Sequence, residues 1–322
     1  MNILIIGGAG FLGTNLVQRC LAESSAQVTV LDSLDPLFQS KWSTVAAVEE
    51  RVKFVQGDLR DHELLQSTIQ GQNIIFNCAG QTSHPLSMQQ PLLDTELNCL
   101  CNLLVLEAVR RHVPKATVVF TSSSTIVGRA DCDVSDEEHV ERPLDIYSAN
   151  KGVAEKYYQI YHSAYDLKTV CVRLPNLFGP YGKSDSQFGF FNYFISLARA
   201  GKPIPVYGKG DQKRNILYVE DATEVLWQVA HEPRVCGSLF LATGNEHPTV
   251  LEIAEQIDAC FGGGGVKPVA WPDDRRRIEI GSVTLSSTRL RTITGWRPRY
   301  NLVSGLQRTK EIMDAISREG PP

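Results

Sequence analysis

The stretch YSANK places Tyr147 and Lys151 four residues apart, on a helix that the sequence predicts over 146–165. Side chains at this spacing share one face of a helix. A tyrosine ordinarily has a pKa near about 10, and a neighbouring ammonium favours its phenolate form. The pair can therefore move a proton to or from a hydroxyl, although an amphipathic surface pair has the same spacing.

A cluster of hydroxyl side chains precedes this helix, in TSSSTIVG after the apolar run Val118–Phe120. A strand that ends in serines presents them at the carboxyl edge of a parallel sheet, where open α/β sheets bind their ligands. Ser123 is the hydroxyl that we expect to hold a substrate oxygen beside Tyr147. Capping alone would explain one of these serines more readily than all three.

Glycines recur every three residues in GGAGFLG, at Gly7, Gly10 and Gly13, directly after an apolar run and before an amphipathic segment. This is the context of a dinucleotide-binding turn, in which glycines let the backbone approach a diphosphate; a purely structural turn has the same glycines. Asp32 ends the next expected strand, where an acid can bond ribose hydroxyls, and residues 33–40 contain no arginine or lysine. The pattern favours NAD over NADP.

A further acid, Asp58 in GDLRD, ends the third expected strand. At that edge of the sheet its carboxylate would reach the adenine amino group of a dinucleotide. Capping of the following helix is an equally compatible interpretation.

Alternating apolar runs and amphipathic segments predict the elements that position these residues. Strands are expected at 2–6, 27–31, 52–56, 73–78, 117–121, 169–173 and 238–242, and helices at about 11–23, 61–69, 91–112, 146–165 and 219–232. This alternation predicts an α/β fold, a Rossmann-type doubly wound parallel sheet with a smaller, mixed α/β C-terminal lobe. The expected domains are 1–174 with about 215–242 for the sheet, and 175–214 with 243–322 for the lobe.

Charge and composition limit the function classes. The net charge of the 322 residues is −4 and the longest basic run is Arg275–Arg277, which argues against a nucleic-acid partner. The first apolar stretch, 3–6, is too short for a membrane span or a signal segment, so we expect a cytoplasmic protein without a membrane partner. The eight cysteines are scattered, which predicts reduced thiols and no metal site.

Taken in order, these motifs resemble the extended short-chain dehydrogenase/reductase family, in particular its nucleotide-sugar epimerases and dehydratases. The resemblance covers essentially the whole chain and rests on GGAGFLG, Asp32, GDLRD, NCAGQ, TSSSTIVG, YSANK, RLPNLFGPYG, VYGKGDQKRNILYVED and GWRPRY…GL. It implies that Ser123, Tyr147 and Lys151 are catalytic and that NAD is the cofactor. The residues expected to contact NAD are Gly7, Gly10, Phe11, Leu12, Gly13, Asp32, Asp58, Leu59, Ala79, Gly80, Gln81, Asn98, Tyr147, Lys151 and Pro175.

The same resemblance implies contacts to a nucleotide-diphosphate sugar. Asn176 and Arg214 match residues near the diphosphate, and Arg277 is our choice for a second arginine from DDRRRIEIG, where a solvated basic loop is the alternative. A planar guanidinium binds phosphate bidentately. The segment QTSHPLSM is expected to line the sugar pocket. The expected substrate contacts are Ser83, His84, Ser123, Ser124, Asn176, Arg214 and Arg277, with Gln81 a further candidate for specificity.

Departures from the family pattern narrow the activity. Val127 and Asn215 stand where tyrosine and aspartate are usual, and Ser124 and Thr125 stand where 4,6-dehydratases carry an Asp-Glu pair. Dehydration needs an acid and a base, so a standard 4,6-dehydratase is disfavoured. The leading hypothesis is an NAD-dependent epimerase that oxidises C4, or C2, and returns hydride to the other face. A 4-keto-sugar-nucleotide reductase using NAD(P)H and a non-catalytic sensor are the alternatives. The resemblance also implies a homodimer packed through 91–112 and 146–165.

Overall fold

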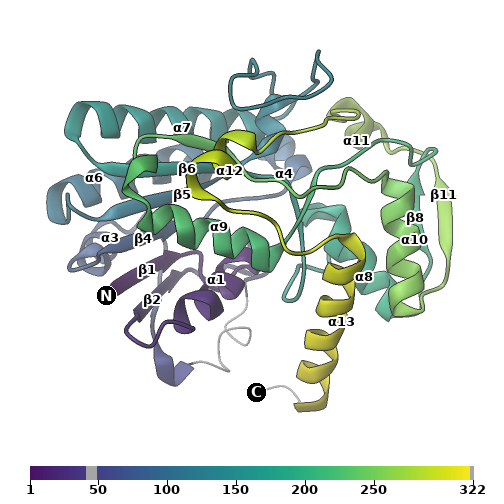
Figure 1. Ribbon diagram of the computed structural model, residues 1–322, viewed down its shortest axis with the longest axis horizontal. Coiled ribbons are helices and arrows are strands. Elements are labelled where there is room, and N and C mark those ends of the chain that lie inside the picture. Colours follow the sequence, from purple (N-terminus) through teal and green to yellow (C-terminus); the bar gives the residue numbers. More distant parts are fainter. Residues whose placement is uncertain (41–48, 320–322) are drawn as a thin grey trace.

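The computed structural model describes residues 1–40 and 49–319. Its main lobe is built on one parallel sheet (Figure 1). Seven strands lie in the order β10-β6-β5-β4-β1-β2-β3. Their bounds are β1 (Asn2–Ile6), β2 (Gln27–Asp32), β3 (Val52–Gln56), β4 (Ile74–Asn77), β5 (Thr117–Ser123), β6 (Lys168–Leu174) and β10 (Leu239–Leu241). The order reverses between β1 and β4, and in such sheets ligands bind at the carboxyl ends beside this reversal.

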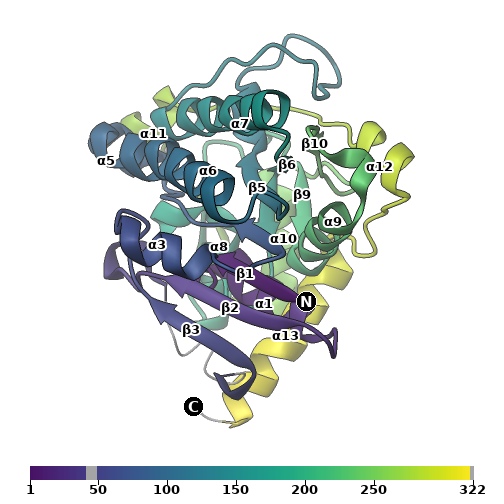
Figure 2. The same ribbon diagram turned by 90° about the vertical axis from the view of Figure 1, so that its left-hand side faces the viewer.

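Helices cover both faces of the sheet, as Figure 2 shows. One face carries α1 (Phe11–Leu21) and α9 (Val219–His231), and the other carries α3 (His62–Ile69), α6 (Cys101–His112) and α7 (Ile146–Tyr165). Alternate residues of β1 enter two different cores: Ile3 and Ile5 pack with one set of helices, Leu4 and Ile6 with the other. This burial on both faces explains why the strand is a continuous apolar run in the sequence. The parallel sheet with helices on both faces confirms the predicted Rossmann-type fold.

The segment expected as one helix over 91–112 consists of three parts. These are α5 (Pro91–Thr95), a π-helical segment η3 (Glu96–Leu100) and α6, and a short helix α4 (His84–Gln89) comes before them. A π turn inserts an extra residue into the helical path, and the continuous helix expected over 91–112 did not include this interruption.

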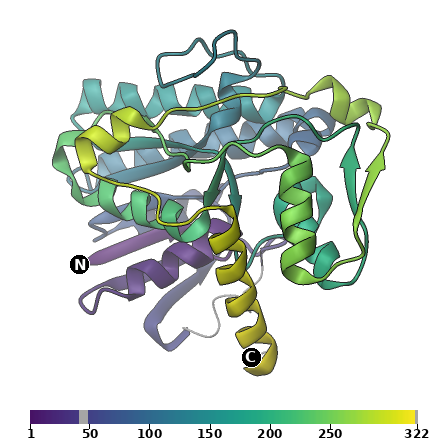
Figure 3. The same cartoon turned by 45° about the vertical axis from the view of Figure 1, so that its right-hand side comes forward.

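The smaller lobe lies at the carboxyl edge of the sheet (Figure 3). Its elements are β7 (Asn176–Phe178), α8 (Phe190–Arg199), β8 (Ile204–Tyr207), β9 (Ile216–Tyr218), α10 (Val250–Phe261), β11 (Val266–Val269), α11 (Asp273–Arg277) and α13 (Leu302–Glu319). Strand β7 pairs with β9 and β8 pairs with β11, all in parallel. Phe178, Phe194 and Ile253 belong to a separate apolar core for this lobe.

One late segment packs on the main lobe. Helix α12 (Thr288–Thr294) contributes Leu290, and Trp296 follows it; both join the core formed with α1 and α9. Both residues fall in the range expected for the smaller lobe. No helix among residues 1–40 and 49–319 has the length and apolar composition to span a membrane.

Candidate active site

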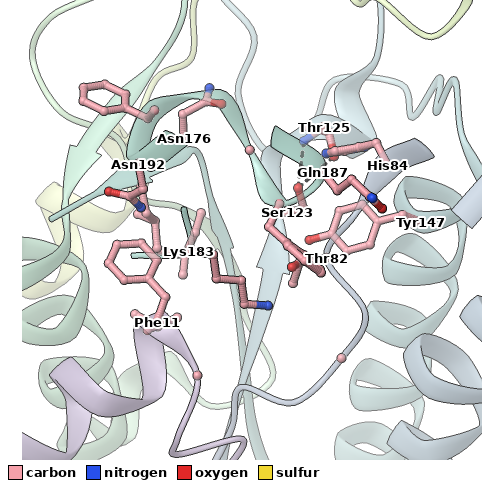
Figure 4. Close-up of a pocket in the computed structure, with 18 of the residues that line it drawn as sticks. Phe11, Thr82, His84, Ser123, Thr125, Tyr147, Asn176, Lys183, Gln187 and Asn192 are labelled. Atoms are coloured by element: carbon pink, nitrogen blue, oxygen red, sulfur yellow. Dashed lines mark hydrogen bonds between the residues drawn. The ribbon is translucent and has the colours of Figure 1, made fainter. Parts of the chain in front are cut away.

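A cavity of about 500 Å³ lies between the carboxyl edge of the sheet and the smaller lobe, and residues of both lobes line it (Figure 4). It contains the glycine turn, the ends of β2, β4 and β5, the first turns of α7 and the segment after β6. The residues expected to bind cofactor that line it are Gly7, Gly10, Phe11, Leu12, Gly13, Asp32, Asp58, Leu59, Ala79, Gly80, Tyr147, Lys151 and Pro175.

The glycine turn connects β1 to α1 and has no room for larger side chains. Gly7 has φ +77°, and a Cβ there would lie 2.8 Å from the backbone nitrogen of Ala79. A Cβ on Gly13 would lie 2.1 Å from the carbonyl oxygen of Gly7. The backbone therefore passes close to the next strand and leaves the start of α1 open to the cavity, where helix N–H groups favour an anion.

Asp32 ends β2 in a buried position beside this turn. Its Oδ2 accepts a hydrogen bond from the backbone N–H of Ala9 and its Oδ1 accepts one from Leu34, each at 2.9 Å. Burial raises the pKa of Asp32, and these two bonds oppose the rise. The carboxylate is thus fixed in the cavity wall, with the glycine turn on one side.

Asp58 also lines the cavity, with Arg60 holding its carboxylate. The Asp58 Oδ2 lies 2.6 Å from Nη2 of Arg60, and this hydrogen bond is the main reason that the pKa of Asp58 is lowered. The cap of α3 is Asp61, whose side chain accepts from the N–H of Leu64. Asp58 therefore does not cap the helix, and the expected reach toward adenine remains a prediction.

Tyr147, Lys151 and Ser123 meet where β5 ends and α7 begins. Figure 4 shows the side chain of Ser123 beside that of Tyr147, and the Nζ of Lys151 lies 6.0 Å from the centre of the Tyr147 ring. Lys151 Nζ also donates to the carbonyl of Thr121 at 3.1 Å and lies over the ring of Phe120. The three side chains that the sequence analysis chose are brought together in one wall.

Burial dominates the ionisation of this pair. It raises the pKa of Tyr147 far above the ordinary value, while the bond from Ser123 opposes the rise. It lowers the pKa of Lys151 to about 8. A charged phenolate in this wall thus depends on the hydrogen bonds and cations around it.

His84 begins α4 and faces Tyr147 in the cavity. The two rings are edge to face with centroids 4.8 Å apart, and Nδ1 of His84 lies 2.6 Å from Oδ2 of Asp145. Ser124 and Asn176 line the same cavity, and the side-chain amide of Asn176 donates to the carbonyl of Asn215 at 3.1 Å. These expected substrate contacts are therefore in reach of one ligand.

The arginine choice needs a correction. Arg214 lines the cavity, and its Nη2 donates to Glu279 at 2.6 Å. From the triplet, Arg275 lines the cavity and donates to the carbonyl of Ser186, whereas Arg277 is exposed and outside the wall. The triplet forms α11, so residues two apart point to different sides of the helix.

Three further residues that were expected to contact cofactor or substrate do not line the cavity: Gln81, Asn98 and Ser83. Asp94 accepts bonds from the side-chain amides of Gln81, at 2.7 Å, and Asn98, at 3.0 Å. Ser83 caps α4 by accepting from the N–H of Leu86. All of them are buried and none lines the cavity, so their place in the fold is to fix the wall.

Sequence reasoning missed Lys183 and Asp145, both of which line the cavity. Lys183 follows the loop after β7, and Figure 4 shows its side chain reaching into the space between the lobes. No spacing in the sequence ties it to Asp32, which acts on it electrostatically. Asp145 did carry a signal, because an aspartate just before a helix is a preferred cap.

Comparisons with known proteins agree with this geometry. The model of the NAD dependent epimerase/dehydratase family matches residues 3–238. The chain is 30% identical over 319 residues to a dTDP-glucose 4,6-dehydratase of Streptomyces niveus, covering 97% of this chain and 92% of that protein. It is 27% identical to the UDP-glucose 4-epimerase of Mycolicibacterium smegmatis, covering 97% and 98%.

A solved structure gives the same result. The structure of the Thermus thermophilus UDP-glucose 4-epimerase in complex with NAD aligns with this chain with a TM-score of 0.86 and 28% identity. The alignment covers 98% of this chain and 100% of that one. The glycine turn and Asp32 fit a bound NAD, since Gly7, Gly10 and Gly13 line the cavity at the start of α1 and the carboxylate of Asp32 is fixed in the same cavity wall. The chain therefore uses NAD and belongs to the NAD dependent epimerase/dehydratase family.

Proposed function

We propose that the protein is a nucleotide-sugar epimerase that oxidises its sugar transiently at C4, or at C2. One observation carries the proposal: Ser123, Tyr147 and Lys151 meet in a cavity that the glycine turn enters at one end and Arg214 lines at the other. A sugar nucleotide held by its diphosphate would place a sugar hydroxyl near Tyr147. Relatives that act on UDP-glucose support this substrate class.

The residues that would hold NAD are on the cavity wall. The amides at the start of α1 suit a diphosphate, and Asp32 suits ribose hydroxyls while disfavouring a 2′-phosphate. When bound, NAD accepts a hydride from the sugar and returns it. The protein's share is to bind, orient and exchange protons.

Proton transfer falls to Tyr147. Its phenolate takes the proton of the sugar hydroxyl while that carbon becomes a ketone, and its phenol gives the proton back when the alcohol forms again. Lys151 favours the phenolate by its charge, and Ser123 donates a hydrogen bond to the substrate oxygen. Epimerisation follows if the ketone turns over in the cavity between the two steps.

The diphosphate is assigned to the other end of the cavity. Arg214, Arg275 and Asn176 all line this cavity. Two guanidinium groups can each bond two phosphate oxygens. This anchoring would leave the sugar as the part of the substrate that is free to turn.

A 4,6-dehydratase is the second candidate, because a dehydratase is 30% identical to this chain. The two residues after Ser123 are Ser124 and Thr125, which offer no carboxylate to remove a carbon-bound proton. A 4-keto-sugar reductase is the third candidate, and it would consume reduced cofactor in net amounts.

The test is a panel of UDP-, dTDP-, CDP- and GDP-sugars with the purified protein and NAD, resolved by NMR. An epimer without net cofactor consumption supports the proposal, loss of water identifies a dehydratase, and net oxidation of NADH identifies a reductase. Tyr147→Phe should lower the rate by about 100-fold or more. Tyr157→Phe is the matched control, since Tyr157 lies on the same helix outside the cavity wall and contacts Cys99. If no epimer forms from any sugar, the epimerase proposal fails.

A further inference from the structure

The side chain of His84 lines the cavity beside that of Tyr147, and Figure 4 shows the two together. Their rings are edge to face, with centroids 4.8 Å apart. Nδ1 of His84 lies 2.6 Å from Oδ2 of Asp145, and Nε2 has no hydrogen-bond partner among the residues that the structure describes. One nitrogen of the imidazole is therefore held by the protein, and the other is available to a ligand.

Asp145 is itself fixed, so it can fix the imidazole. Its side chain is 4% exposed, and its Oδ1 accepts a hydrogen bond of 2.7 Å from the backbone N–H of Ser148, in the first turn of α7. Burial raises the pKa of Asp145, but the hydrogen bonds from His84 and Ser148 outweigh it and the net shift is downward. The side chain is therefore a carboxylate at neutral pH, and a carboxylate only accepts hydrogen bonds.

This carboxylate decides which nitrogen of His84 carries the proton. Because Asp145 cannot donate, the neutral imidazole must carry its proton on Nδ1, and its lone pair is then on Nε2. In an Asp–His pair of this kind, the imidazole accepts a proton at Nε2 and the carboxylate stabilises the imidazolium that forms. The pair is therefore a base, and its basic atom is the nitrogen that Asp145 does not hold.

The other carboxylates that line the cavity are engaged elsewhere. Among the described residues these are Asp32, Asp58 and Glu279. Two backbone N–H groups hold Asp32, and arginine side chains hold Asp58 and Glu279. The Nζ of Lys151 donates to a backbone carbonyl at 3.1 Å. His84 is thus the base that the cavity places beside the tyrosine of the proposed function.

We propose that His84, held by Asp145, removes and returns a carbon-bound proton next to the ketone carbon of the oxidised sugar. The inference rests on the proposed function, because oxidation at C4 creates that ketone. It adds a second activity to the same cavity, the enolisation of a 4-keto sugar nucleotide toward C3 or C5. His84 contacts the substrate in this step, whereas Asp145 acts through His84 and is a positioning residue.

The step moves one proton and no hydride. The C–H bond next to the carbonyl breaks, its electron pair forms the carbon–carbon double bond of an enolate, and Nε2 of His84 gains the proton. The enolate oxygen takes the negative charge, and the hydroxyls of Tyr147 and Ser123 can donate hydrogen bonds to it. Burial raises the pKa of Tyr147, which keeps it a phenol and therefore a donor at this stage. Return of the proton restores the ketone, and nothing is oxidised or reduced.

The test supplies the ketone directly, so it does not depend on oxidation by the protein. The NAD-loaded protein is incubated in D₂O with saturating dTDP- or UDP-4-keto-6-deoxyglucose, and NMR follows the loss of the proton signals at C3 and C5. Wild type should speed the exchange at one of these carbons by about 100-fold or more over buffer. His84→Gln should lose this acceleration and still bind NAD in calorimetry, which shows that it is folded. His62→Gln, an exposed change on α3, is the matched control and should keep it.

A second measurement tests the role of Asp145. The ¹⁵N chemical shifts of the labelled His84 ring report which nitrogen carries the proton. Nδ1 should carry it in wild type, and both tautomers should appear in Asp145→Asn, which keeps a residue suited to cap α7.

Three results would each overturn the proposal: no accelerated exchange in wild type with either ketone, exchange that persists in His84→Gln, or a neutral His84 that carries its proton on Nε2 in wild type. The sugar panel measures oxidation and its reversal, whereas this test begins from the ketone. The two proposals can therefore fail separately.

Discussion

The guanidinium of Arg214 and the carboxylate of Glu279 lie 2.6 Å apart in the wall of the cavity. Arg214 also donates to the carbonyls of Lys213 and Gly281, at 3.0 and 2.8 Å, so its side chain is held in one place. A diphosphate that binds there meets a cation that is already oriented. Preorganised cations of this kind lower the entropic cost of binding.

Replacing this arginine should weaken nucleotide binding. Arg214→Met is expected to reduce the affinity for UDP or dTDP by about 10- to 100-fold, because charged hydrogen bonds contribute about 1.5–3 kcal/mol. Arg275→Met should also weaken it, and Arg277→Met, outside the wall, is the matched control. Titration calorimetry measures all three; equal losses for Arg275→Met and Arg277→Met would contradict the assignment.

Lys183 gives the cavity a pH dependence. Burial lowers the pKa of Lys183 to about 8, although Asp32 opposes the shift. A bound diphosphate favours the ammonium, so affinity for the dinucleotide should fall as pH rises through about 8. Lys183→Met should bind more weakly below that pH and show a flatter profile between pH 7 and 9. The check is the dissociation constant at several pH values, with wild type as reference; unchanged slopes would refute it.

A buried ion pair joins α7 to strand β6 of the sheet. Arg173 on β6 and Glu155 on α7 are almost fully buried, with 2.6 Å between Nη2 and Oε2. Arg173→Met would leave Glu155 buried with the Ser122 hydroxyl but without a cation, which should cost about 3–5 kcal/mol of unfolding free energy. Adding Glu155→Gln should restore part of the loss. Denaturant unfolding of both variants decides the point, and a double variant no more stable than the single one would argue against it.

Glu107 should contribute to stability at neutral pH and lose that contribution in acid. Its hydrogen bond from Arg110 is the main reason that its pKa is lowered from 4.5 to about 2. Since the folded pKa is the lower one, the stabilisation is present above about pH 4.5 and is lost as pH falls toward 2. Glu107→Gln should flatten this acid limb in denaturant unfolding series. Glu255→Gln, an exposed change on α10, should leave it as in wild type.

We propose that the protein forms a homodimer, packed through residues 91–112 and α7. Leu92 is 85% exposed and Ile160 is 52% exposed, and apolar residues this open are costly in water. Leu92→Glu with Ile160→Glu should shift the protein to monomer in light scattering at micromolar concentration. Val303→Glu, on α13, is the control, and a wild-type protein that is monomeric throughout would rule the interface out.

How much of the fold and of the site the sequence predicts depends on whether the interactions involved are between residues close together in the chain. The range of α7, expected at about 146–165, agrees with the structure because its amphipathic pattern is a local feature of the sequence. That Ser123 lies near Tyr147 was predictable. Ser123 ends a parallel strand and Tyr147 is in the first turn of a helix, and both therefore lie at the carboxyl edge of the sheet. The π turn in 96–100 has no local signal.

Contacts between the lobes could not be predicted in this way. Arg275, and not Arg277, lines the cavity; which of them does so depends on how α11 is rotated against the cavity, and three identical side chains do not encode that rotation. Lys183 reaches Asp32 across a gap in sequence of about 150 residues, so only the folded arrangement brings them together.

Strand β10 has a consequence for how this chain can be divided. It begins at Leu239, just after the range matched by the family model, and pairs with Cys171, Val172 and Arg173 of β6. A fragment cut at residue 238 would leave these backbone groups at an open edge, where another chain's strand can add. With β10 in place the edge strand of the sheet is only three residues long, 239–241, and so short an edge limits self-association.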